Sequence, residues 1–290
     1  MDGTGLLLAK QGEGQLVPIL SWKKRYLGVD VRRALLLLLG GLLAPLLNAA
    51  PLELQLNAYH LPPFAYDPQR SDQHQGFMVE LIALAGRELG WKIEPRYLPF
   101  ERSTRAFGRG EGDLHVAVIP SDRAELDLLQ EKWACADSLM TLRVYRYDNL
   151  EFVTEDESQT PGADLLVAGP LRDLVLPRVE PSTDVQVVNE TFRLSKMFWY
   201  ERARSAIIAG LTMEDFFSAT PPDFDYQRTL LFQEQVKLCM NRSLINVEGK
   251  LKRFMSAWKR LYRDRDQEPV RSILQYYQVE SYWWLDELHR

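Results

Sequence analysis

The chain has 290 residues, 46% of them hydrophobic, and a formal net charge of −5 at pH 7. This length provides a core for one large domain or two modest ones. No basic block lies outside the N-terminal segment, and nucleic acid is therefore disfavoured as a partner, since its phosphates require a basic surface.

An apolar run occupies residues 34–47 and follows Arg32 and Arg33. It is followed by Asn48, Ala49 and Ala50, small residues suited to cleavage. This order is typical of a cleavable signal peptide, and the run is short for a membrane span. We expect residues 1–49 to be removed on secretion; an uncleaved N-terminal anchor is the alternative.

The next part of the chain alternates strand and helix patterns. Strands are predicted over residues 52–57, 91–97 and 114–119, and helices over residues 78–89 and 99–107. The strand patterns alternate apolar and polar residues. The first helix carries an apolar stripe, and Gly90 suits the C-cap that would end this helix. Strand–helix alternation with short connections predicts a parallel sheet in an α/β fold.

Residues 110–123 are the stretch of greatest interest. A polar turn leads into the strand 114–119, and Pro120 and Ser121 then suit the start of a helix. Arg123 would lie just beyond the carboxyl end of the strand, where open α/β sheets bind ligands. A guanidinium near a helix N-terminus suits a carboxylate. The alternative is an ordinary surface arginine in a first helical turn.

The second half of the chain repeats this alternation less regularly. A strand is predicted at residues 142–147. Further strands are predicted at residues 165–168, 184–188, 205–209 and 236–240, and helices at residues 191–202, 213–217, 247–262 and 268–277. The helix at 247–262 has the strongest amphipathic pattern.

Cys135 and Cys239 are the two cysteines of the chain. In an oxidising compartment they can form a disulfide, but they are far apart in sequence, and two separate buried thiols are equally compatible with the pattern. The four histidines are scattered, and no Cys/His cluster has metal-ligand spacing. We expect no metal and no cofactor.

Residues 51 to about 140 resemble the first lobe of amino-acid-type periplasmic solute-binding proteins (extracellular solute-binding protein family 3). The matching features, in chain order, are Pro63-Phe64, Gly76-Phe77 with Glu80, Leu89-Gly90, Gly110 with Asp113, and Arg123. The resemblance implies a type II periplasmic binding fold, in which two α/β lobes are joined by two crossing strands and hold the ligand in the cleft between them.

This resemblance also implies a domain organisation and a role. Residues 50–141 would begin lobe 1, residues 142–235 would form lobe 2, and residues 236–290 would return to lobe 1. The protein would be a periplasmic monomer that captures a small solute and delivers it to an ABC-type permease or a sensor receptor. It would not be an enzyme.

In the family, the arginine that matches Arg123 holds the ligand carboxylate. The usual hydroxyl residues five and seven positions before it are Val118 and Val116 here, and the usual aromatic platform is Leu61. We expect the ligand to contact a set of lobe-one and lobe-two side chains: Tyr59, Phe64, Arg102, Ile119, Ser121, Arg123, Arg172 and Arg204.

The second lobe lacks the acid that usually pairs with a ligand ammonium; the matching stretch is residues 201–204, Glu-Arg-Ala-Arg. A buried unpaired ammonium costs several kcal/mol. Ordinary amino acids are therefore not expected to be the best ligands, and an acidic or polar solute with an apolar body is favoured. Arg172, Arg202 and Arg204 would line such a cleft, or else lie on the surface.

Two alternatives remain open. Some relatives are dehydratases that use a carboxylate in the cleft as general acid or base, a role for which Glu80 and Glu101 are candidates. The other alternative is a degenerate member that binds no small molecule and serves as an interaction module.

Overall fold

The computed structural model describes residues 50–69, 74–119, 130–153 and 163–279. The chain divides into two units, Met1–Ala50 and Pro51–Arg290, and the fold described below is that of the second unit. Within the described residues, no helix is both long and apolar enough to cross a membrane.

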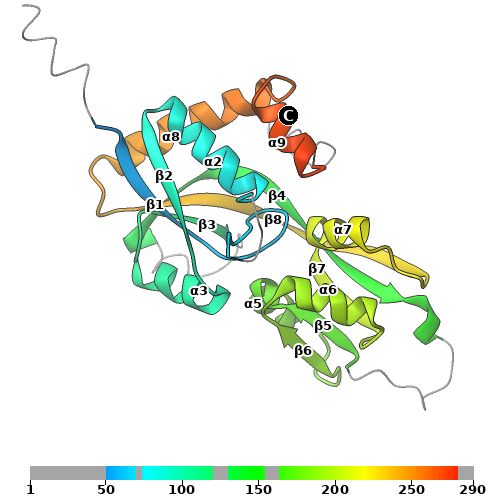
Figure 1. The fold of residues 1–290 in the computed structure, drawn as a ribbon. Helices are drawn as coiled ribbons and strands as arrows, with labels where there is room; N and C mark the ends of the chain where they lie inside the picture. The colour runs from blue at the N-terminus through cyan, green and yellow to red at the C-terminus, as the bar shows by residue number, and fades with distance from the viewer. Residues whose placement is uncertain (1–49, 70–73, 120–129, 154–162, 280–290) are drawn as a thin grey trace, which may run out of the picture. The chain divides into compact units, whose positions relative to one another are not determined.

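Eight described strands form a single mixed sheet (Figure 1), in the order β2-β1-β3-β8-β4-β7-β5-β6. The strands are β1 (Leu52–Ala58), β2 (Trp91–Tyr97), β3 (Leu114–Ile119), β4 (Trp133–Asn149), β5 (Leu165–Ala168), β6 (Val185–Val188), β7 (Ser205–Ala209) and β8 (Tyr226–Asn241). The helices are α2 (Phe77–Glu88), α3 (Phe100–Arg109), α5 (Arg172–Val175), α6 (Thr191–Trp199), α7 (Gly210–Ala219), α8 (Val247–Arg263) and α9 (Val270–Tyr276). Short 3-10 turns cover Leu150–Val153, Gly169–Leu171 and Leu176–Arg178.

The sheet contains two parallel groups. Strand β1 pairs in parallel with β2 and β3, and β5 pairs in parallel with β6 and β7, as the strand–helix alternation predicts. We call the first group, with α2, α3, α8 and α9, the first lobe, and the second group, with α5, α6 and α7, the second lobe. The long antiparallel strands β4 and β8 run through both lobes (Figure 1).

Buried apolar faces hold each lobe together. In the first lobe, Leu81 and Ile82 of α2 are fully buried, as are Phe254 and Trp258 of α8. The Trp258 indole N–H also donates a hydrogen bond to the backbone oxygen of Leu139, at 3.1 Å. In the second lobe, every residue of β5 and β7 is buried. Continuous burial is typical of parallel strands that are covered on both faces.

Strands β4 and β8 are much longer than the sequence predicts. In β4, register shifts between Cys135 and Ser138 and between Ser138 and Met140 interrupt the alternation of faces. Bulges of this kind remove the period of two on which strand prediction depends. In β8, residues 226–231 are all exposed and give no apolar alternation. The expected lobe boundaries at 141/142 and 235/236 fall inside these two strands.

A disulfide joins Cys135 of β4 to Cys239 of β8. The two residues are direct partners in the antiparallel pairing, and their Cα atoms lie 3.9 Å apart. The bond spans 104 residues of sequence, a stretch that includes the whole second lobe. It therefore fixes the two crossing strands to each other at their first-lobe end.

Replacing both cysteines, as Cys135→Ser with Cys239→Ser, should lower the free energy of unfolding by about 2–5 kcal/mol, because the unfolded chain regains the freedom of a long closed loop. Denaturant unfolding of the oxidised protein and the double variant measures this difference. Reduced wild type serves as the control and should match the variant. Equal stability of oxidised and reduced wild type would contradict the expected contribution.

His115 of β3 is buried beside the disulfide. Its ring stacks on Phe107 at a centroid distance of 4.3 Å and lies 6.3 Å from the ring of Trp133. Burial lowers the pKa of His115 to about 4. The folded protein therefore holds this imidazole neutral at pH values where the unfolded chain already binds a proton.

Because the folded pKa lies below the unfolded one, His115 costs no stability above about pH 6.5, and its cost grows as pH falls towards 4. By linkage it should remove about 3 kcal/mol of unfolding free energy across that interval. Denaturant unfolding at pH 7 and pH 4.5 tests this, with His115→Phe for comparison. The variant should lose clearly less stability on acidification than wild type, and an identical loss would argue against a depressed pKa.

Candidate functional site

A cavity of about 80 Å³ lies where strands of both lobes end. Ala58 is the last residue of β1, Ala168 the last of β5 and Ala209 the last of β7, and all of them line it. The carboxyl ends of parallel strands are the usual ligand-binding edge of open α/β sheets. The cavity is therefore the candidate site.

The cavity walls are mainly apolar. The first lobe and the crossing strands contribute Leu56, Asn57, Ala58, Tyr59, Leu61, Phe64, Ala65, Met78, Val79, Val116, Val118, Leu142 and Val236. The second lobe contributes Ala168, Pro170, Leu171, Thr191, Ile208 and Ala209. Among these described lining residues, Asn57, Tyr59 and Thr191 have polar side chains, and none is charged.

Two of the expected ligand contacts, Tyr59 and Phe64, do line the cavity. Tyr59 follows β1 and packs edge-on against Phe100, with ring centroids 5.0 Å apart. Desolvation by burial raises the pKa of Tyr59 to about 12, so its phenol is neutral at physiological pH. Phe64 is buried and packs against Phe77 at 5.2 Å, so one of its sides belongs to the core.

The other expected contacts lie elsewhere. Arg102 on α3 and Arg172 at the start of α5 are exposed, and neither lines the cavity. Arg204 precedes the first residue of β7, at the opposite end of the strand from the cavity, and its Nε lies 3.8 Å from an Asp164 oxygen. Arg202 is also exposed, with its guanidinium 5.9 Å from the centre of the Tyr200 ring.

The residues around the proposed carboxylate anchor are only partly described. Ile119 is the last residue of β3 and pairs with Gln235 of β8. Ser121 and Arg123 lie outside the described residues. The apolar character of β3 before them is nevertheless clear, because Val116 and Val118 line the cavity in place of the family's hydroxyl residues.

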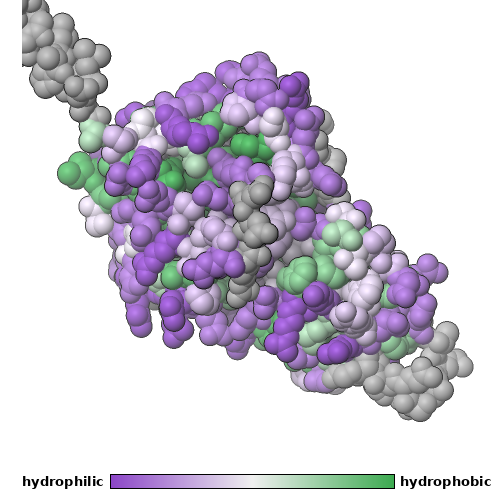
Figure 2. All heavy atoms as spheres, viewed as in Figure 1, coloured by the Kyte–Doolittle hydropathy of each residue, from purple (hydrophilic) through white to green (hydrophobic). Residues whose placement is uncertain are grey.

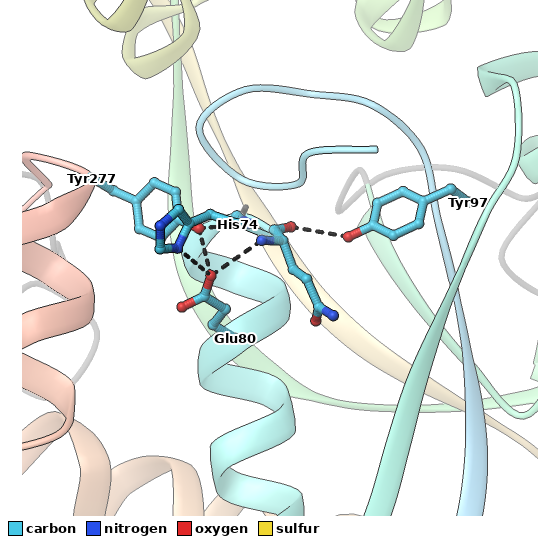
Figure 3. Close-up of polar contacts among 6 residues, drawn as sticks. His74, Glu80, Tyr97 and Tyr277 are labelled. Carbon is cyan, nitrogen blue, oxygen red and sulfur yellow. Dashed lines mark hydrogen bonds and ion pairs between the residues drawn. The ribbon is translucent and has the colours of Figure 1, made fainter. Parts of the chain in front are cut away.

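Glu80 holds the turn that precedes α2 (Figure 3). Its Oε1 accepts a hydrogen bond from the Tyr277 hydroxyl at 2.6 Å and another from the Gln75 backbone N–H at 3.2 Å. The Tyr277 oxygen in turn accepts the Gly76 N–H at 2.8 Å. Glu80 does not line the cavity, and these bonds give it a structural role.

Gly76 in this turn has a φ of 95°, a conformation that favours glycine. A Cβ at this position would lie 2.4 Å from the backbone oxygen of Phe64, a cavity residue. The turn thus brings the start of α2 close to the cavity wall. The sequence did not indicate the role of Tyr277, which lies 197 residues beyond its hydrogen-bond partner Glu80.

Among the described residues, two pairs of side chains form hydrogen bonds between the lobes. The Asn189 side-chain N–H donates to Oε1 of Glu101 on α3 at 2.8 Å. The Tyr66 hydroxyl lies 3.2 Å from an oxygen of Asp215 on α7 and donates to it. Burial raises the pKa of Asp215, while the Tyr66 hydrogen bond opposes the shift.

Glu80 and Glu101 are the two carboxylates considered above for catalysis. Glu101, like Glu80, does not line the cavity.

The Glu101–Asn189 contact should be worth about 0.5–1.5 kcal/mol of unfolding free energy. A double-mutant cycle with Glu101→Ala and Asn189→Ala measures this coupling. Glu101→Gln is the matched control, since its amide oxygen still accepts the hydrogen bond and should preserve part of the coupling. Additive effects of the two alanine substitutions would show that the contact contributes nothing in solution.

No protein-family model and no curated protein matches this sequence. Solved structures do match its fold. A substrate-binding protein of an ABC uptake transporter from Streptococcus pneumoniae, with bound histidine, is 14% identical and covers 79% of this chain and 93% of its own, with a TM-score of 0.59. An ancestral arginine-binding protein bound to arginine is 13% identical and covers 79% of this chain and 99% of its own, with a TM-score of 0.59.

A histidine kinase sensor domain with similarity to periplasmic binding proteins is also similar. It is 11% identical and covers 77% of this chain and 94% of its own, with a TM-score of 0.57. Because the sequence identities are low, the likeness to these structures concerns the fold alone. The continuous sheet, the crossing strands β4 and β8 and the cavity at the strand ends agree with it. This chain therefore has the two-lobed type II periplasmic-binding-protein fold.

Proposed function

We propose that this protein is a periplasmic solute-binding protein that captures a small carboxylate-bearing ligand with an apolar body between its two lobes. The observation that carries the proposal is the position of the cavity, at the carboxyl ends of strands from both lobes. A ligand held there contacts both lobes at once, so binding favours the arrangement in which they are close.

The hydrogen bonds between the lobes support this view. Glu101–Asn189 and Tyr66–Asp215 each join a residue of the first lobe to one of the second. Neither is a backbone contact, so both can break without disturbing the sheet. A ligand that bridges the lobes adds its own contacts to these, and the closed form is what a membrane partner would recognise. That partner is an ABC-type permease or a sensor receptor.

The proposed anchor for the ligand carboxylate is Arg123, by its position in the sequence after β3. The described walls offer no charged group, so an anchor must come from outside them. Two of the similar structures hold histidine and arginine, ligands with an ammonium and a basic side chain. Among the described lining residues there is no acid of the kind that such cations need, which favours a carboxylic acid without an ammonium.

Thermal melting of residues 50–290 against amino acids, dicarboxylates, aromatic acids and short aliphatic acids tests the proposal. A ligand at 100 times its Kd adds about 2.7 kcal/mol and should raise Tm by about 5–10 °C. Arg123→Ala should abolish the shift, whereas Arg172→Ala, which removes an exposed arginine away from the cavity, should preserve it. Absence of a shift with every compound would count against a solute-binding role.

A further inference from the structure

Three of the strands that reach the cavity end in small side chains. Ala58, Ala168 and Ala209 close β1, β5 and β7 in turn, and each is less than 10% exposed. A larger residue at any of these positions would occupy space that is now open. The small side chains at these three strand ends therefore contribute to the open space of the cavity.

The polar side chains of the wall do not suit a cation. The Asn57 side-chain N–H donates to the backbone oxygen of Glu111 at 2.6 Å, which ties its amide to the turn before β3. Tyr59 is a neutral phenol, and Thr191 offers only a hydroxyl. Because a buried ammonium or guanidinium needs a carboxylate partner and the described walls contain none, these walls disfavour a ligand cation.

The outer surface has a different character. Figure 2 shows mainly hydrophilic residues on the visible face, with apolar residues in small separate groups. The apolar side chains that line the cavity are buried instead, and they include Leu171 and Ile208 as well as the alanines. A site of this kind gains affinity by removing apolar surface from water.

The cavity is small. An apolar cavity of about 150 Å³ accommodates a benzene ring, and this one measures about 80 Å³. We propose that it is the subsite for a compact, uncharged, aliphatic group of the ligand, such as the branched end of a short carboxylic acid. This inference rests on the proposed function and adds to it the chemical class of the bound group.

The test uses isobutyrate, L-arginine and L-histidine as ligand probes and xenon as a probe of the empty cavity. Isobutyrate should raise Tm, and both basic amino acids should leave it unchanged. Ala209→Leu should weaken isobutyrate binding at least tenfold, and Ala168→Val, on a different strand, provides a second variant if the first folds poorly. Ala219→Leu is the matched control, because Ala219 is exposed at the end of α7 and does not line the cavity.

Xenon binding, monitored through chemical shifts in NMR spectra, tests the apolar cavity separately from the solute-binding role. Xenon should perturb residues around the cavity in wild type and in Ala219→Leu, but not in Ala209→Leu. Xenon binding without any ligand-induced Tm shift would uphold an apolar cavity and reject the solute-binding role. A Tm shift with L-arginine or L-histidine that survives in Ala209→Leu would overturn the subsite and leave the solute-binding role intact. Failure of xenon to enter would also overturn the subsite.

Discussion

The antiparallel pairing of β4 with β8 is the constraint on which the rest of the structure depends. It runs from Trp133 opposite Asn241 to Asn149 opposite Tyr226. Strand β3 attaches to the free edge of β8, and β7 attaches to that of β4, so each parallel group is added to one side of the same ribbon. Both lobes therefore share one sheet, and any movement of one relative to the other must twist or bend these two strands.

This arrangement explains why the cavity lies where it does. Parallel strands of each lobe approach the ribbon with their carboxyl ends on the side of the cavity, so the terminal residues of β1, β5 and β7 become its walls. Those residues are alanines, and β3 adds valines where a polar site would need hydroxyl groups. No described lining residue carries a charge, so the described wall presents apolar surface and shape rather than charge.

Much of the fold was predictable from the sequence, because β1 and α8 have clear periodic patterns and β5 and β7 are short, continuous apolar runs. Strands β4 and β8 were underestimated since bulges and exposure remove that pattern. Parallel pairing followed from strand–helix alternation. The site was harder to predict. Arg204 was chosen from the family resemblance, yet it precedes the predicted strand at residues 205–209, and strand direction alone places it away from a cleft at the carboxyl ends.

The hydrogen bonds and ring contacts of Tyr66 and Tyr277 with distant parts of the chain were not predictable, and they connect the cavity to the contact between the lobes. Tyr66 hydrogen-bonds to Asp215 of the second lobe, and its ring stacks on Tyr277, with centroids 5.9 Å apart. Tyr277 in turn holds the Gly76 turn, after which Met78 and Val79 of α2 line the cavity. A single aromatic and polar cluster thus supports both a cavity wall and a contact between the lobes. A displacement of Tyr66 would therefore remove a support of this cavity wall together with a contact between the lobes.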